Sequence, residues 1–410
     1  MKKSIYLVIA LCMTVFSSCS SDDDSSSGSL QGQTAKIELT LTGSNANTRA
    51  SGADPVTGVA TAEATVGNIV VGIFKDENVL VIQEVSSPST NSANTITVPS
   101  VKGTISDCTG VVVANVPAAS LSALKSATTK SLFLGETISL QNATTLDGSD
   151  EDDDGDGDVQ VSTILPMSGE VKDGDATTFS LTGAGTTSLA VSLVRMVSRI
   201  TLTSLTADFT GTADPGATFK LQRVFLRDAI ATTKVTTSTT PADAMPSGAS
   251  YISGGAWDET TKAWKTDDGD VNLFLYDKLG TAEAIGTTSP IGQTPVIVPY
   301  YWFYAFANSG STNPTAFVIQ GLFDQDGSGT SYSDEPVFYP VIINKAQDGT
   351  TGVTAGSTGS ITRNNLYNLS VAIKGKGVSS PTENIGPSNL SITVTVAPWP
   401  TAIEQTVEFN

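Results

Sequence analysis

The chain of 410 residues contains no histidine. Histidine is the commonest general base and the commonest transition-metal ligand in proteins. Its absence excludes a Ser-His-Asp triad, a Cys-His pair and a His-based zinc site. Paired carboxylates could serve a glycosidase without histidine, but no local pattern among the 41 acidic residues marks an acid or a nucleophile. The sequence therefore predicts that the protein is not an enzyme.

Cysteine is also scarce, with Cys12, Cys19 and Cys108 only. Cys12 lies in a targeting segment, and removal of that segment together with acylation of Cys19 leaves Cys108 without a disulfide partner in the mature chain. Stability must then come from packing. Cys108 is predicted to be a small buried apolar residue rather than a nucleophile.

Basic residues are few, since 22 Lys and Arg stand against 41 Asp and Glu, giving a net charge of −19 and a pI of about 4.2. A nucleic-acid partner is excluded, because phosphate binding needs a basic stripe and none is visible. Long helical patterns are scarce, whereas Thr, Ser, Gly and Val dominate. With 39% apolar residues, this composition predicts an all-β chain with real cores.

Residues 1–18 have the pattern of a secretory signal, with a basic start at Lys2 and Lys3 and a mostly apolar run to Phe16. Cys19 follows two small residues and resembles the cysteine of a bacterial lipobox, which is acylated after a cut just before it. Phe16 departs from the usual Leu of that motif. An ordinary signal cut nearby is the alternative interpretation.

The first strand is predicted at residues 34–42, where apolar and polar residues alternate strictly. The polar, flexible stretch from Gly43 to Ala50 follows and contains Arg49, the first arginine of the chain. Proteases cut loops of this composition, and a cut after Arg49 would detach the whole first strand. From composition alone, Arg49 is an ordinary loop residue. The apolar face of the strand consists of Ala35, Ile37, Leu39 and Leu41.

Short strands separated by turn signals fill most of the remaining chain, which suggests β-sandwiches. One short helix is expected at Ala118–Ala127, and a domain boundary near residue 186. The predicted strands are Gly67–Phe74, Val79–Val85, Thr95–Val101, Val111–Val116, Thr128–Leu134, Thr178–Leu181, Leu189–Leu205, Lys220–Arg227, Asn272–Tyr276, Thr294–Phe306, Thr315–Phe323, Val337–Ile343 and Leu366–Ile373.

The last twenty residues contain two alternating segments, Ser391–Ala397 and Thr401–Asn410, separated by Pro398-Trp399-Pro400. Proline cannot donate to a ladder, so the Pro pair should separate two strands. The final strand presents Ile403, Val407 and Phe409 on one face. An apolar strand that has left its own sheet needs a partner to cover it, and we expect that partner to be another copy of the same chain.

Two acidic stretches invite a calcium interpretation. The run from Asp147 to Asp158 lacks a Glu at the twelfth loop position and is typical of a solvated loop. A second loop matches the spacing of a calcium-binding loop, although strands rather than helices are predicted on both sides of it. A polar hairpin loop explains the same residues, so both interpretations stay open. The ligands would be Asp324, Asp326, Ser328, the carbonyl of Thr330 and Glu335.

The most apolar stretch is the aromatic cluster from Tyr300 to Phe306. Exposed aromatic rings can stack on sugars, which leaves a glycan-binding interpretation available. A strand buried on both faces explains the cluster more simply, and we favour it. Trp257 and Trp264 carry the same ambiguity.

Several motifs together resemble the C-terminal signature of fimbrillins, the shaft subunits of type V pili in the Bacteroidales. They are the stretch from Ile361 to Ile373, the Val394–Trp399 segment, and Glu404 to Phe409. Leu193–Ile200 also looks like a strand common to that family. The lipoprotein signal, the Thr-Arg-Ala site and an acidic tag at Asp22–Asp24 fit the same group.

The resemblance implies two tandem transthyretin-like β-sandwich domains with few short helices. It implies export as a lipoprotein and then cleavage between Arg49 and Ala50 by an arginine-specific protease, which opens an apolar groove. The terminal strand of another subunit would fill that groove by strand addition, and about ten extended residues span about 33 Å, enough to cross a sandwich. The segments implied are 1–18 as signal peptide, 19–49 as propeptide, 50–185 and 186–410 as the two sandwiches, and 401–410 as donor strand.

The predicted function is therefore a structural subunit of cell-surface fimbriae that forms homopolymers and supports adhesion. Its partners would be other copies of itself, accessory pilus subunits and the processing protease, with membrane contact only through the lipid of the precursor. The alternatives are a monomeric surface glycan-binding lipoprotein and a minor anchor subunit of the same pilus. No cofactor is expected apart from the calcium considered above.

Overall fold

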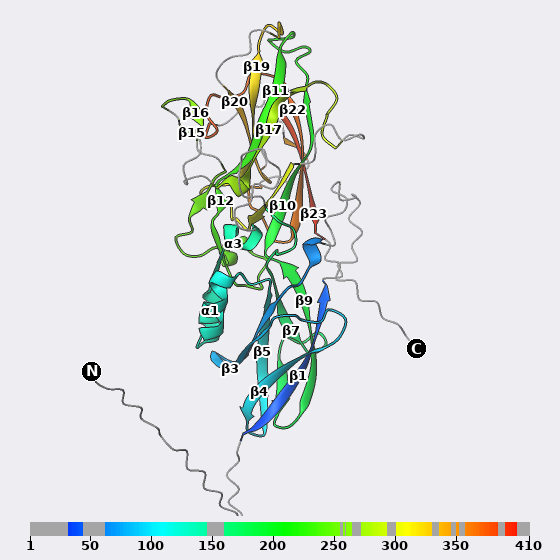
Figure 1. The fold of residues 1–410 in the computed structure, drawn as a ribbon, viewed down its shortest axis with the longest axis vertical. Helices are drawn as coiled ribbons and strands as arrows, with labels where there is room; N and C mark the ends of the chain where they lie inside the picture. Colours follow the sequence, from blue (N-terminus) through cyan, green and yellow to red (C-terminus); the bar gives the residue numbers. More distant parts are fainter. Residues whose placement is uncertain are drawn as a thin grey trace, which may run out of the picture. The chain divides into compact units, whose positions relative to one another are not determined.

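The computed structural model describes residues 32–43, 62–145, 160–254, 257–258, 260–264, 272–292, 301–329, 336–345, 350–351, 357–383 and 390–399. Strands dominate these residues and form two sandwiches in tandem (Figure 1). The all-β prediction is therefore confirmed. In the described ranges, no helix is long and apolar enough to cross a bilayer.

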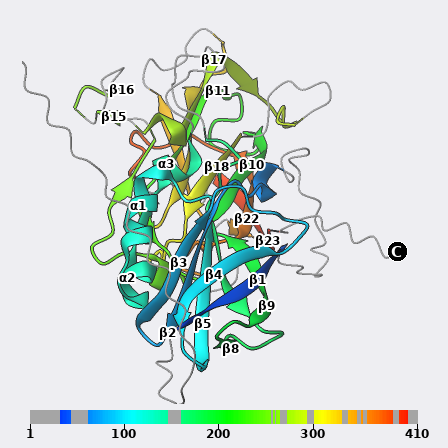
Figure 2. The ribbon, with the colours of Figure 1, turned by 60° about the horizontal axis from the view of Figure 1, so that its bottom comes forward.

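The N-terminal sandwich is built from one curved eight-stranded sheet. Its order is β3-β2-β5-β7-β9-β1-β4, with β8 paired to β5. β1 lies inside this sheet, beside β9 and β4 (Figures 1 and 2). The strands are β1 (Gln33–Gly43), β2 (Ile69–Lys75), β3 (Asn78–Val85), β4 (Asn94–Val101), β5 (Thr104–Ala114), β7 (Met167–Lys172), β8 (Phe179–Thr182) and β9 (Thr186–Arg195).

The C-terminal sandwich has a five-stranded sheet of order β18-β10-β22-β23-β21 and a four-stranded sheet of order β17-β11-β19-β20. Two small two-stranded sheets, β12-β14 and β15-β16, accompany them. The strands are β10 (Val197–Ala207), β11 (Thr218–Arg227), β12 (Ala229–Ile230), β14 (Tyr251–Ile252), β15 (Trp257–Asp258), β16 (Ala263–Trp264), β17 (Tyr276–Ile285), β18 (Tyr301–Phe306), β19 (Ala316–Asp324), β20 (Val337–Ile342), β21 (Thr350–Thr351), β22 (Asn365–Ile373) and β23 (Leu390–Pro398).

The chain passes from the first sandwich to the second at Met196, rather than near residue 186. β9 still pairs with β1 and β7, and β10 pairs with β18 and β22. The predicted single strand Leu189–Leu205 is thus wrong, because it is two strands in different sheets. The backbone N–H of Met196 donates to the carbonyl of Pro166 at 2.7 Å, which continues the β7-β9 register to the last residue before β10.

A few short helices accompany the strands: η1 (Ala62–Ala64), α1 (Ala118–Ser126), α2 (Lys130–Gly135), α3 (Leu140–Thr144), α4 (Pro241–Ala244) and η2 (Leu273–Leu275). The α1 prediction is confirmed. Two predicted strands, Thr128–Leu134 and Asn272–Tyr276, are corrected to α2 and η2. In α2 the Thr129 side chain caps the helix by accepting from the N–H of Leu132 at 3.1 Å. A further short pair joins β6 (Thr137–Ser139) to β13 (Thr232–Lys234).

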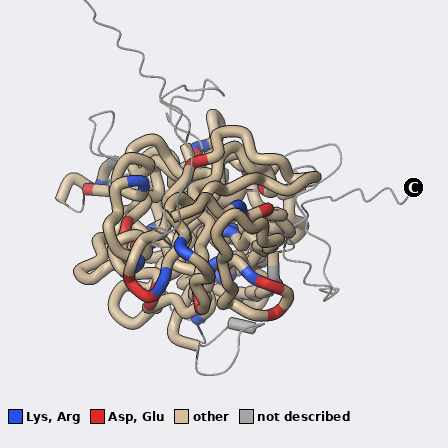
Figure 3. Tube along the Cα trace, turned by 90° about the horizontal axis from the view of Figure 1, so that it is seen from below, with Lys and Arg blue, Asp and Glu red and all other residues tan. Residues whose placement is uncertain are grey.

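Two apolar cores explain why the strands alternate as they do. The core of the N-terminal sandwich takes Ile69, Val71 and Ile73 from one face of β2. The other face of β2 gives Val70 and Phe74 to a larger core that continues through the helices into the C-terminal sandwich. β2 is therefore buried on both sides, as a continuous apolar run predicts. Lys and Arg are interspersed with Asp and Glu over the described trace (Figure 3).

Candidate functional site: the first strand and the root of the C-terminal segment

β1 alternates between core and solvent as its sequence predicts. Ala35, Ile37, Leu39 and Leu41 are at most 1% exposed, and Lys36 and Glu38 point out. The side chains predicted to leave, Ile37, Leu39 and Leu41, therefore lie in the core. That they are displaced stays a prediction.

Both edges of β1 are paired. β1 runs parallel to β9, from Lys36 opposite Thr186 to Gly43 opposite Leu193. It runs antiparallel to β4, ending with Leu39 opposite Asn94. Removal of β1 would leave two unpaired ladder edges facing each other across an apolar floor. Such a gap fits one extended strand.

β4 has β1 as its only strand partner among the described residues. Its other side is held by a side chain, because the amide of Gln83 on β3 donates to the carbonyl of Thr95 at 3.3 Å and accepts from the N–H of Thr97 at 2.9 Å. The Gln83 amide thus imitates one peptide link and joins the two ends of the curved sheet. If β1 leaves, this contact helps to keep β4 as the far wall of the gap.

β23 forms where the alternation predicts it and buries the expected face through Val394, but Val396 on the same face is 38% exposed. Leu390, Ile392 and Val394 of β23 are at most 3% exposed, and β23 ends at Pro398. Trp399 follows and is 2% exposed. We call Trp399 the root, because the predicted donor segment begins just after it.

The root is fixed through its backbone and its ring. The Trp399 N–H donates to the Asn364 carbonyl at 2.9 Å, and the Asn364 amide donates to the Trp399 carbonyl at 3.2 Å. The indole N–H donates to Glu63 Oε2 at 3.0 Å. The ring stacks on Tyr304, with centroids 5.9 Å apart, and the Arg195 guanidinium lies 4.4 Å from the ring centroid.

Glu63 is a fully buried carboxylate at this place. Its Oε1 accepts from Arg199 Nη1 at 2.6 Å and from the Tyr304 hydroxyl at 2.9 Å, while its backbone carbonyl accepts from Arg195 Nε at 2.8 Å. Burial and the adjacent Glu63 carboxylate raise the pKa of Tyr304 well above its usual range. We name Glu63, Arg195, Arg199, Tyr304 and Trp399 the root cluster. Since a buried ion pair survives only when it is well bonded, these contacts depend on one another.

A third buried arginine ties the same region together. Arg363 is 3% exposed and donates to the carbonyls of Arg195, Val194 and Thr236. Burial lowers the pKa of Arg363 to about 10. The end of β9 is therefore bound to the segment that precedes β22.

Several predicted residues lie outside the described residues: Cys19, Arg49, Ala50, Ile403, Val407, Phe409, Thr330 and Glu335. Cys108, in contrast, is fully buried in the N-terminal core, and burial raises the pKa of its thiol. Its prediction as a small core residue is confirmed.

The described half of the candidate calcium loop holds its own hydrogen bonds. Asp324 Oδ2 accepts from the N–H of Gly329 at 2.8 Å, and Asp326 Oδ1 from the N–H of Ser328 at 2.9 Å. Asp324 is buried, and its Oδ1 has no hydrogen-bond partner among the described residues. These groups fit a cation and a polar hairpin equally, and no metal-ligand cluster occurs within the described ranges. Calcium stays a prediction, which isothermal titration tests.

The aromatic cluster is a core strand. Tyr301, Phe303, Tyr304 and Phe306 on β18 are at most 4% exposed. The Trp257 ring packs on the Phe338 ring, with centroids 4.8 Å apart. The favoured interpretation is therefore confirmed for these four rings of β18, whereas Trp302 and Trp257 are half-buried and Tyr300 lies outside the described residues.

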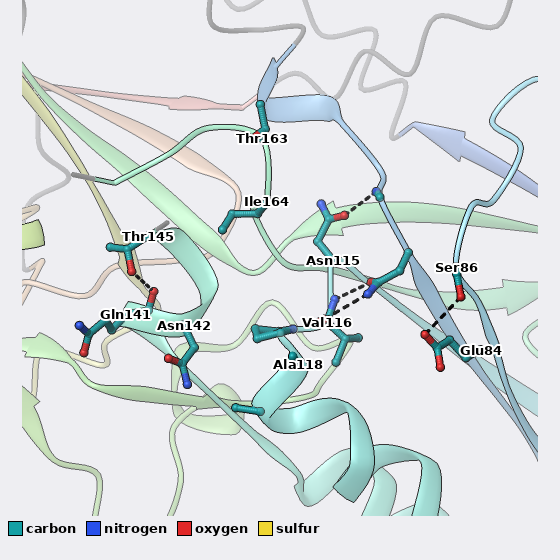
Figure 4. A pocket seen from close by; sticks show the side chains of 14 residues that line it. Glu84, Ser86, Asn115, Val116, Ala118, Gln141, Asn142, Thr145, Thr163 and Ile164 are labelled. Atoms are coloured by element: carbon teal, nitrogen blue, oxygen red, sulfur yellow. Dashed lines mark hydrogen bonds between the residues drawn. The ribbon is translucent and has the colours of Figure 1, made fainter. Parts of the chain in front are cut away.

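A pocket of about 780 Å³ lies beside the start of α1 (Figure 4). Several of its polar side chains are bonded within the protein: the Asn115 amide accepts from the Gly67 N–H and donates to the Leu165 carbonyl, both at 2.8 Å. Glu84 pairs with Lys125 at 2.6 Å. None of the fourteen lining residues is aromatic. The pocket therefore lacks a stacking surface for sugars.

Sequence reasoning missed the root cluster and Gln83. The root cluster joins residues 63, 195, 199, 304 and 399, which no local spacing brings together. The one available signal is Trp399 between two prolines, which marks the end of a strand and belongs to the family resemblance but does not indicate a buried cluster.

Known proteins match both halves of this chain. A family profile described as the major fimbrial subunit protein (FimA) matches residues 35–205. Another, described as the FimA4 pilin C-terminal domain, matches residues 303–399. The major fimbrium subunit FimA type-4 of Porphyromonas gingivalis is 33% identical over 109 residues, which cover 22% of this chain and 28% of that relative. The match thus spans less than a third of the curated relative's length.

Solved structures share the fold. A fimbrilin (FimA) from Porphyromonas gingivalis W83 has a TM-score of 0.56 at 17% identity, covering 91% of this chain and 99% of that one. A putative cell adhesion protein from Parabacteroides distasonis has a TM-score of 0.58 at 18% identity, covering 93% and 100%. The fold is that of Bacteroidales fimbrial subunits. With both FimA profiles matched, the chain belongs to the fimbrillin family.

Proposed function

We propose that this chain is a structural subunit of cell-surface fimbriae that polymerises by strand exchange after arginine-specific cleavage at Arg49–Ala50. The observation that carries the proposal is the place of β1, an internal and fully paired strand at the very start of the described chain. A single cut between β1 and η1 is enough to make it a separate peptide.

β1 contributes much of the stability of its sandwich. Burial of Ile37, Leu39 and Leu41 contributes about 1.5–3 kcal/mol for each side chain, or about 5–9 kcal/mol together. Domains are stable by about 5–15 kcal/mol in total. The N-terminal sandwich therefore needs a strand in this position, either its own or another one.

Cleavage changes which of two competing strands occupies the position between β9 and β4. A tethered strand competes at an effective concentration of about millimolar, and dilution of the free peptide to about micromolar removes about 4 kcal/mol of that advantage. An incoming strand that stays tethered to its own subunit then has the advantage. Thr401–Asn410 would be this donor, with Ile403, Val407 and Phe409 entering where Ile37, Leu39 and Leu41 leave. Head-to-tail exchange does not close, so it builds filaments.

The arginines of the chain favour a selective cut. Besides Arg49 there are five. Arg195 and Arg199 are fully buried and Arg363 is 3% exposed, while Arg223 and Arg227 lie within β11. Proteases cleave extended, accessible segments, so folded structure protects these five. Arg49 is left as the target.

The precursor would reach the surface as a lipoprotein acylated at Cys19. Cleavage after Arg49 removes that lipid anchor together with β1, which couples release from the outer membrane to polymerisation. The partners are then other copies of the chain and accessory subunits of the fimbria, and the filament would support adhesion.

Electron microscopy before and after arginine-specific proteolysis tests the proposal. We expect filaments only after cleavage, and none from Arg49→Lys, which keeps the charge but removes the site. Arg227→Lys is the matched control and should polymerise normally. Deletion of Thr401–Asn410 should abolish filaments, and long filaments from a cleaved chain with this deletion would refute strand exchange.

A further inference from the structure

The root cluster gathers groups from both sandwiches around a single indole ring. Glu63 belongs to η1 and Arg195 to the end of β9, whereas Arg199 and Tyr304 come from β10 and β18. Trp399 is among the largest fully buried side chains of the described chain. A core needs no carboxylate for stability alone, because well-packed apolar groups often serve as well as a buried ion pair. The cluster joins both sandwiches to Trp399, the residue that precedes the proposed donor segment.

The backbone of Trp399 is fixed by hydrogen bonds on both sides, although Trp399 is the last described residue. Its N–H and carbonyl both bond Asn364, at 2.9 and 3.2 Å. Asn364 has a positive φ of 59° and donates its own N–H to Val197. The residue before the donor segment is thus fixed by its backbone as well as its ring, and the next residue, Pro400, has a restricted φ.

We propose that the root cluster is a clamp that fixes where, and in which direction, the donor strand leaves the subunit. This inference rests on the proposed strand exchange. In such a filament each subunit is joined to the next through its donor segment, so every force between neighbours enters the donor subunit at Trp399. Glu63 and Arg195 pass that force directly to the N-terminal sandwich, and Arg199 and Tyr304 pass it to the C-terminal one.

Two functions can therefore be separated by experiment. The groove that would accept a strand lies between β9 and β4, over a core to which Trp399 does not belong, and the Glu63 carboxylate bonds to the root cluster instead. Loosening the clamp should leave uptake of a strand unchanged and weaken only the delivery and rigidity of the chain's own strand. The clamp residues are positioning residues in this sense.

The test compares Trp399→Phe and Trp399→Leu with the matched control Trp257→Phe, a ring that packs on Phe338. Trp399→Phe keeps a ring on Tyr304 but loses the hydrogen bond to Glu63, and Glu63→Gln removes the charge at similar shape. Filament persistence length is measured by electron microscopy. Uptake of a labelled Thr401–Asn410 peptide is measured separately, on cleaved chains that lack their own last ten residues.

We expect the Trp399 variants and Glu63→Gln to form filaments several-fold more flexible than those of the native chain and of Trp257→Phe, with peptide uptake unchanged. Equal persistence lengths would overturn the clamp, and so would a parallel loss of peptide uptake. If Trp399→Leu does not fold, Trp399→Phe and Glu63→Gln decide the question. Failure of the native chain to form filaments at all would instead refute the proposed function, so the two failures are distinct.

Discussion

The two sandwiches begin with the same arrangement and differ in how the first strand is attached. β1 lies between a parallel neighbour, β9, and an antiparallel one, β4. β10 likewise lies between parallel β22 and antiparallel β18. However, β10 continues directly from β9 through Met196, whereas β1 is joined to the rest by residues 44–61, which contain Arg49. One first strand can be released by a single cut and the other cannot.

The cores of the two sandwiches also differ, in their content of aromatic rings. The core that contains β1 is almost entirely aliphatic, with Phe179 its only aromatic ring among the described residues. All four tryptophans, and every tyrosine except Tyr6, lie after residue 250. Aliphatic cores tolerate exchange of residues of similar volume, whereas rings with hydrogen-bonded hydroxyl or N–H groups demand fixed partners. The N-terminal sandwich is thus suited to accept a different strand and the C-terminal one to stay unchanged.

The largest expected effect comes from removing β1 altogether. A chain that begins at Ala50 should lose about 5–9 kcal/mol in its N-terminal sandwich, so the amides of β4 and β9 should lose protection from hydrogen exchange. Peptide Gln33–Gly43 should restore that protection. Tryptophan fluorescence reports the C-terminal half, and its melting should change far less. Full protection in the shortened chain alone would contradict the comparison.

Matched Leu→Ala substitutions in β1 and β10 test the same difference between the two first strands. Leu39 on β1 and Leu202 on β10 are both fully buried. In the precursor, Leu39→Ala and Leu202→Ala should each cost about 2–5 kcal/mol, measured by denaturant unfolding. In assembled filaments Leu39→Ala should have no effect if the proposed exchange has removed β1, whereas Leu202→Ala should still destabilise. A cost for Leu39→Ala that persists in filaments would show that β1 is retained.

The sequence supported the strands far better than the contacts between them. The alternation of residues 34–42 and 391–397 predicts β1 and β23, because one buried face imposes a period of two. The strand prediction for Thr128–Leu134 is wrong because Thr129 is a good N-cap residue and starts a short helix there. Met196 was missed because residues 196–202 are all buried, so no change in alternation marks the break. The root cluster could not be predicted, because it depends on pairing across the whole fold.

Above pH 10 the C-terminal sandwich should lose folding stability that the N-terminal one keeps, by about 1 kcal/mol for each buried tyrosine over the first pH unit. Burial raises the pKa of Tyr301, Tyr304 and Tyr339 above the ordinary value near 10. The unfolded chain therefore loses these protons first, so their stability contribution is complete below pH 10 and declines by up to about 1.4 kcal/mol per pH unit for each above it. Tyr304→Phe should flatten the decline in chemical-denaturation midpoints of the C-terminal half. An equal slope in variant and native chain would refute this assignment.

The smallest effect concerns Gln83, which bridges β3 to β4. One partly exposed amide bridge contributes about 0.5–1.5 kcal/mol, so Gln83→Leu should barely change the unfolding of the precursor, where β1 also holds β4. In the proposed exchange β4 loses β1 after cleavage, and the same substitution should then slow uptake of the Thr401–Asn410 peptide, measured by fluorescence anisotropy. Gln222→Leu, on β11 of the other sandwich, is the matched control. Equal uptake by both variants would mean that β4 keeps its position without the bridge, so the groove would be more rigid than the strand order alone implies.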